Sequence, residues 1–269
     1  MKKSSNKGLL IFLVVFLSII VLALSALMVL GISGKGGMFG LHFGSSNASS
    51  NLVAEETITV DDINSINARI KSGKLKIIST EAGDDAKIVA KMYAKEKDWI
   101  RFDRLDNKIE IEDKSNDCHF FCINWEGVSV ELSVPKNYVG DFNIDTSYGD
   151  VEIGDFKSAT IKLDSSAGDV GIGSAKNITA SLSAGNFGLG NCYGRVRIDN
   201  SMGNVEIDRL DITDDSDIEL SMGNVEIRTV GNVRVDAKTD MGNSSVSGGN
   251  PKADVTLKIE NSMGNITVR

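Results

Sequence analysis

The heptapeptide SMGNVEI occurs twice in this chain, at 201–207 and again at 221–227. Five related heptapeptides share its glycine: SYGDVEI (147–153), SAGDVGI (166–172), SAGNFGL (183–189), DMGNSSV (240–246) and SMGNITV (262–268). Successive glycines are separated by 19, 17, 18, 20, 19 and 22 residues, which gives a period near 19. A fixed period of this kind indicates one structural unit stacked on the next.

Each repeat is expected to form two short strands around a turn. Apolar residues alternate with polar ones before the glycine, as at Val196 and Ile198, and again after it, as at Val205 and Ile207. Period-two alternation is the signal of a half-buried strand, and the glycine allows the sharp corner between the two strands. The predicted turn glycines are Gly149, Gly168, Gly185, Gly203, Gly223, Gly242 and Gly264.

Two all-β folds fit this pattern. A Gly-Asn turn between alternating strands is also a strong hairpin signal, and a set of hairpins would form an antiparallel β-sandwich. The constant period favours a parallel β-solenoid with coils of about 19 residues. A looser copy, SGKLKI (72–77), precedes Gly149 by four periods, because Gly73 and Gly149 are 76 residues apart. The segment between them is therefore expected to add further coils.

In a solenoid the residue after each turn glycine would form a column. Its members are Asp150, Asp169, Asn186, Asn204, Asn224, Asn243 and Asn265. Stacked Asn and Asp side chains are expected to form a hydrogen-bonded ladder along the axis. A calcium site is the alternative, but only two members are acidic and calcium needs several converging oxygen ligands. If the rungs stack in sequence order, replacing Asn224 should destabilise the fold more than replacing Asn265 near the end.

The residue before each glycine forms a second column: Tyr148, Ala167, Ala184, Met202, Met222, Met241 and Met263. Methionine adapts to irregular packing and is also frequent at promiscuous binding surfaces. A place in the core or in a self-packed edge is expected for these side chains, and a partner-binding stripe is the alternative.

The chain has few residues that point to catalysis. Glu152, Glu206 and Glu226 occupy one repeat position that alternates with buried positions, so they are expected to lie on a solvated face. A carbohydrate-active enzyme would need converging acids. Nucleotide-binding, metalloprotease and serine-hydrolase motifs are absent from the sequence. No catalytic residue, metal ligand or cofactor is therefore predicted.

Residues 95–127 interrupt the pattern with a charged and aromatic insertion that contains both tryptophans. Cys118 and Cys122, with His119 between them, are the notable residues in it. A disulfide between the two cysteines, free thiols and a metal site all remain open, although a zinc site usually requires four ligands. The aromatic residues are expected to pack as a cap, and an exposed patch for a partner is the alternative.

The N-terminus predicts a membrane anchor. Residues 1–8 carry three lysines and no acid, and Leu9 to Ile32 follow without a charge. This apolar run suffices to span a bilayer as a helix and exceeds the usual apolar region of a signal peptide. The flanking lysines place the N-terminus in the cytoplasm. Residues 33–56 are rich in Gly and Ser and predict a flexible linker, followed by an extracytoplasmic domain over 57–269.

The overall charge argues against nucleic acid as a partner. Arg and Lys total 29 against 37 Asp and Glu, which gives a formal charge of −8. Proteins that bind nucleic acid normally present a basic face. The membrane and, beyond it, a cell-wall polymer or an envelope protein are the expected partners.

The anchor, the phrase SVELSVPKNY (129–138) and the serial repeats together resemble a bacterial family of β-strand-repeat domains labelled "putative adhesin". Many such proteins are membrane-anchored proteins of Firmicutes, and the resemblance covers about 57–269. It implies a non-enzymatic adhesin or envelope-binding structural module. The alternative is an accessory component of an envelope-stress or signalling system that acts through a membrane partner. The resemblance implies no functional residues.

Overall fold

The computed structural model describes residues 47–48, 51–60, 63–81, 86–115 and 126–269. Every described residue belongs to one compact unit, which spans residues 43–269. The predicted anchor lies outside the described residues. Within the described part, no helix has the length and apolar character needed to cross a membrane.

The described chain is almost entirely β-structure, with one short 3₁₀ helix, η2 (Lys97–Trp99). The strands are β1 (Asn47–Ala48), β2 (Leu52–Thr59), β3 (Ser65–Thr80), β4 (Lys87–Tyr93), β5 (Ile100–Leu105), β6 (Lys108–Asp113), β7 (Glu126–Pro135), β8 (Asp141–Ala167), β9 (Val170–Ala184), β10 (Phe187–Cys192), β11 (Val196–Met202), β12 (Val205–Leu210), β13 (Ser216–Met222), β14 (Val225–Ile227), β15 (Arg234–Met241), β16 (Ser244–Val246), β17 (Thr256–Met263) and β18 (Ile266–Val268).

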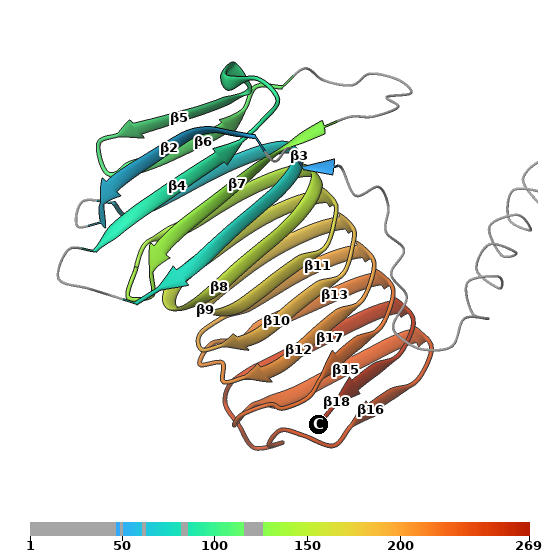
Figure 1. Cartoon of the computed structure of the whole chain (residues 1–269). Helices are drawn as coiled ribbons and strands as arrows, with labels where there is room; N and C mark the ends of the chain where they lie inside the picture. Colours follow the sequence, from blue (N-terminus) through green and yellow to red (C-terminus); the bar gives the residue numbers. More distant parts are fainter. Residues whose placement is uncertain (1–46, 49–50, 61–62, 82–85, 116–125) are drawn as a thin grey trace, which may run out of the picture. The chain divides into compact units, whose positions relative to one another are not determined.

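The repeats stack as rungs, each made of a strand before the turn glycine and a strand after it (Figure 1). The strands before the glycine lie side by side on face 1, and those after it lie side by side on face 2. Face 1 ends with the order β9–β11–β13–β17–β15, and face 2 ends with β9–β10–β12–β14–β18–β16. All these pairs are parallel, so the prediction of an all-β, largely parallel architecture is confirmed.

The core lies between the two faces. Every second residue of each rung points inward, and most of these positions are occupied by buried Val, Ile and Leu, such as Ile198 and Ile207. Three fully buried phenylalanines, Phe142, Phe156 and Phe187, also contribute to the core. The alternation in the sequence therefore sorts side chains between core and solvent, as a period of two requires.

The rung of Gly73 does not lie four coils away from Gly149, as the spacing of 76 residues suggested. Gly73 pairs directly with Gly149, because β3 lies beside β8 in parallel register over Ser65–Ile77. The intervening strands instead build the start of the stack. There β5 pairs with β6, β2 with β4, and β4 with β7, all antiparallel. Among the described strands, the antiparallel pairing that the alternative fold would require occurs only at this end.

The last two rungs are stacked in the reverse of their sequence order. Strand β17 pairs with β13 on one side and with β15 on the other, and β18 likewise lies between β14 and β16. The rung of Gly264 therefore sits between those of Gly223 and Gly242. The final rung of the stack is the one formed by β15 and β16.

The two ends of the stack differ. At the start, half-buried apolar side chains of the antiparallel strands and of η2 pack against the core, among them Val53, Trp99 and Phe102. A capping role for the aromatic insertion is therefore supported where it is described. At the other end, β15 and β16 each have a single strand neighbour among the described residues.

The corner glycines allow the rungs to approach each other. In six of the seven predicted turn glycines φ lies between +132° and +148°; Gly149 is the exception. In all seven, an added Cβ would lie only 1.8–2.1 Å from a carbonyl oxygen of the neighbouring rung. Close backbone contact therefore demands glycine even at Gly149, where φ does not.

Gly203→Ala should destabilise the protein by at least about 3 kcal/mol, because the new Cβ would meet the Gly185 oxygen at 1.9 Å. Gly171 on β9 is the matched control, because a Cβ there would have no atom within 4 Å. Gly171→Ala should stabilise by roughly 0.5–1 kcal/mol by restricting the unfolded chain. Urea midpoints of the full chain in mild detergent measure both changes, and equal midpoints would contradict the argument.

Candidate functional site

The column that follows the corner glycines forms a continuous hydrogen-bonded ladder. Each Oδ1 up to the last rung accepts a backbone N–H from the next rung, as Asn186 does from Asn204 and Asn204 from Asn224, both at 3.0 Å. The side-chain Nδ2 groups of Asn204 and Asn224 also donate to the rung before them, each at 3.2 Å. The ladder starts at Asp150, which accepts the N–H of Asp169 at 3.1 Å. It satisfies backbone groups that the corners would otherwise leave unpaired.

The reversed order of the last rungs changes the end of this ladder. Asn265 is an interior member, because its N–H donates to Asn224 at 2.9 Å and its Oδ1 accepts the N–H of Asn243 at 3.0 Å. The expectation that Asn265 lies near the end is therefore wrong. Asn243 occupies that place.

A second set of amides, which the sequence analysis missed, lies inside the corner. Asn200 and Asn261 are buried, and their Nδ2 groups donate to the carbonyls of Gly185 and Gly223 at 3.0 and 2.8 Å. Both lie three residues before a corner glycine, at a position whose side chain points inward. An asparagine among the apolar residues that alternate along the strand was the signal available in the sequence.

The methionine column is exposed, so of the two expected places the core is excluded and the edge of the stack remains. Met202, Met241 and Met263 expose 49%, 59% and 42% of their surface, and Met222 is half-buried. The register pairs Met202 with Met222, Met222 with Met263, and Met263 with Met241. The four side chains thus form a stripe along the outside of the corner.

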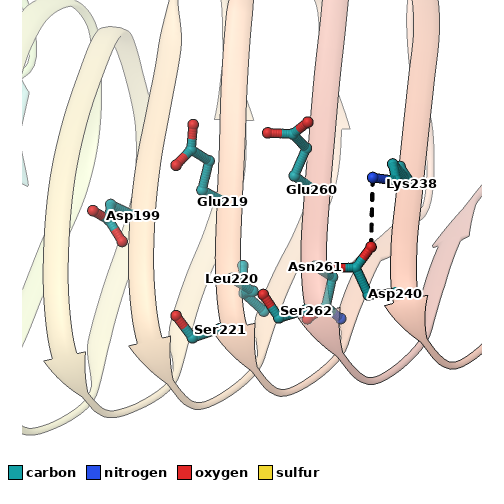
Figure 2. A pocket seen from close by; sticks show the side chains of 9 residues that line it. All are labelled: Asp199, Glu219, Leu220, Ser221, Lys238, Asp240, Glu260, Asn261 and Ser262. Carbon is teal, nitrogen blue, oxygen red and sulfur yellow. Dashed lines mark ion pairs between the residues drawn. The ribbon is translucent and has the colours of Figure 1, made fainter.

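A shallow polar groove of about 330 Å³ crosses the outer side of face 1 over β11, β13, β17 and β15. Figure 2 shows Asp199, Glu219 and Glu260 side by side on successive strands, all on the outer side of the face. We call these three residues the acid column. Ser221 and Ser262 lie closer to the corner, on the strands that carry the two glutamates.

Cations partly neutralise the groove. Lys258 lies 2.9 Å from Glu260, and this hydrogen bond raises the pKa of the Lys258 ammonium group. Lys238 lies 3.5 Å from Asp240 at the edge of the groove (Figure 2). These ion pairs are exposed, so they add little to stability and leave the groups available to a ligand.

The groove is poorly arranged for acid–base catalysis. Neighbouring parallel strands are about 4.8 Å apart and carry their outward side chains in the same direction. Glu219 and Glu260 would therefore contact the same side of a bound sugar, whereas glycosidases place two carboxyl groups on opposite sides of the bond. The groove is suited to hold a ligand by hydrogen bonds and charge.

The glutamates of face 2 are engaged in ion pairs. Glu206 pairs with Arg228, Glu226 lies 3.8 Å from Arg269, and Glu152 lies 2.7 Å from Lys74. The described residues contain no group of three or more acidic, His or Cys side chains placed to hold a metal ion. Cys118 and Cys122 lie outside the described residues.

The family comparison covers most of the described domain. The model of the toastrack DUF4097 family matches residues 63–269. Among curated proteins, none has significant sequence similarity to this chain.

Solved structures with similarity to the chain come from several bacteria. A "putative cell adhesion protein" from Clostridium sporogenes is 15% identical, with a TM-score of 0.36 and coverage of 80% of this chain and 98% of its own. A "putative adhesin" from Bacteroides fragilis is 13% identical, with a TM-score of 0.42 and coverage of 83% and 99%. Another from Parabacteroides distasonis is 11% identical, with a TM-score of 0.39 and coverage of 82% and 99%.

Asn224→Leu should lower the free energy of unfolding by about 1 kcal/mol more than Asn243→Leu. Leucine at 224 removes the acceptor for the N–H of Asn265, whereas no described residue donates to the side chain of Asn243. Urea melts of the two variants of the full chain measure the difference. An equal loss in both variants would show that the ladder does not support the stack.

The Cys192 thiol should react slowly with iodoacetamide at pH 8 in the folded protein. Burial raises the pKa of Cys192 to about 11, so the reactive thiolate is scarce. Peptide mass mapping separates Cys192 from the other two cysteines, and unfolding in urea should restore rapid labelling. Equal rates with and without urea would contradict the buried position.

Proposed function

This chain belongs to the toastrack DUF4097 family, and we propose that it is a non-enzymatic binding module displayed outside the cell membrane. In this proposal residues 9–32 form the anchor, residues 33–56 the tether and the stack of rungs the binding domain. The uncharged run Leu9–Ile32, flanked by three lysines, supports the anchor and the cytoplasmic N-terminus.

The observation that carries the binding role is the groove on face 1. It presents carboxylates and hydroxyls at the constant spacing of parallel strands, without the opposed groups that bond cleavage would need. A ligand that repeats along its length matches such a surface better than a compact molecule does. We therefore propose a linear polymer of the cell envelope as the ligand, with the acid column and Ser221 and Ser262 making the polar contacts.

The binding test uses the full chain in detergent micelles and insoluble wall material from the source cell. The double variant Glu219→Gln with Glu260→Gln should lose at least about tenfold in retention, because two charged hydrogen-bonding groups are removed from the groove. The same substitutions at Glu152 and Glu226 on face 2 are the matched control and should leave retention unchanged.

The outcomes separate the candidate roles. Equal retention of both double variants, or no retention of the wild-type chain, would overturn the polymer proposal. Selective retention of one membrane protein would support the accessory role in envelope signalling. Loss of retention in EDTA would show that a divalent cation links the acid column to the polymer.

The proposed orientation has its own test. Protease added to intact spheroplasts should digest residues 57–269 and spare the N-terminal lysine-rich tail. Digestion only after the membrane is permeabilised would contradict an extracytoplasmic domain.

A further inference from the structure

The stack ends at β15 with an incompletely covered core. The inward side chains Val235 and Ala237 are half-buried, whereas their partners in the preceding strand, Leu257 and Ile259, are fully buried. On face 2, Val246 of β16 is 44% exposed. The last rung thus leaves apolar surface open that every earlier rung covers, and repeat stacks normally cap such an end.

The outer edge of β15 also carries backbone groups that no described strand pairs. The N–H of Arg234 donates to the carbonyl of Val255 at 2.8 Å. This bond shows which alternate residues of β15, beginning with Arg234, direct their backbone groups toward β17. Alternate residues of a parallel strand bond to the same neighbour. The N–H and C=O groups of Val235, Ala237 and Thr239 therefore point toward the free edge. An edge of this kind is a template for pairing with another strand.

The exposed side chains of β15 alternate in sign. Arg234 and Lys238 are basic, Asp236 and Asp240 are acidic, and all four are exposed. When two copies of this strand pair antiparallel about Ala237, Arg234 faces Asp240 and Asp236 faces Lys238 of the second copy. All four facing pairs then have opposite charges, and such cross-strand pairs stabilise a sheet.

We propose that two copies of this protein associate through the edges of β15, in antiparallel register centred on Ala237. The N–H and C=O groups of Val235, Ala237 and Thr239, which point toward the open edge, are those that this register pairs. Each Val235 faces Thr239 of the second copy on the inward side, so the dimer covers the open end of both cores.

The charge pattern selects this register over its neighbours. Moving the centre by one residue, to Asp236 or Lys238, keeps the backbone bonds but places like charges opposite one another, which is destabilising. The Ala237 carbonyl already accepts a long hydrogen bond of 3.5 Å from Ser244. It keeps a second lone pair for the N–H of the second copy.

The test is sedimentation equilibrium of the full chain in detergent micelles at several protein concentrations. The wild-type chain should dimerise, and the dimer should weaken in 1 M salt because exposed charges are screened. Asp236→Lys turns two of the four facing pairs into like-charge pairs, so the dissociation constant should rise at least about tenfold. Combining it with Lys238→Asp restores opposite charges and should restore the dimer.

Asp217→Lys is the matched control. Asp217 lies on the outer side of β13, which has strand neighbours on both sides, so this variant should dimerise like the wild type. A monomeric wild-type chain at all concentrations would overturn the proposal. A dimer that Asp236→Lys leaves unchanged would also overturn it, because the contact would then lie elsewhere in the chain.

Cross-linking checks the register directly. Residues 236 and 238 of the two copies form a non-hydrogen-bonded pair with Cα atoms about 4.5 Å apart, within reach of a disulfide. A mixture of Asp236→Cys chains and Lys238→Cys chains should therefore form more oxidised dimer than either variant alone. An equal yield from all three samples would contradict the register.

Discussion

Adjacent rungs can approach each other at the corner only because neither backbone carries a Cβ there. A methyl group at Gly203 would overlap the Gly185 oxygen, and the same holds along the whole column of corner glycines. This contact brings the residue after each glycine within hydrogen-bonding distance of its equivalent in the next rung. The amide ladder, the parallel register and the common phase of the inward side chains all depend on it.

Such a stack places like residues beside like residues, so its outer surface consists of columns. Most columns mix small polar groups and paired charges, as on face 2, and these suit a solvated surface. The acid column and the exposed methionine stripe are more uniform. In the stripe, Met202 and Met222 are equivalent positions of the identical heptapeptides at 201–207 and 221–227. A surface of this design offers the same chemical groups repeatedly along its axis, and it brings few different groups to one point.

The period in the sequence predicted the strands, the corner glycines and the composition of the outer columns, because each of these depends on local alternation. It could not predict which rung lies beside which. The heptapeptides around Gly223, Gly242 and Gly264 are similar, so the sequence of a rung does not identify its neighbour. The order depends on how β17 fits between β13 and β15. The pairing of Gly73 with Gly149 was missed for the same reason. Exposure of the methionines was not predictable either, because methionine is common both in cores and on binding surfaces.

Strands β17 and β18 lie between strands that precede them in the sequence, and this constrains the order in which the domain can fold. While a ribosome is still translating residues 256–269, the correct neighbour of β13 does not yet exist, and β15 presents a similar alternation and corner. The stack can therefore close only once residues 256–269 are available, and any earlier pairing of β13 with β15 must open again. The backbone of Arg269 is then bonded on both sides: its N–H donates to the carbonyl of Ile227, and its carbonyl accepts the N–H of Val230. Folding of this domain is therefore completed by residues 256–269 and does not follow the order of the sequence.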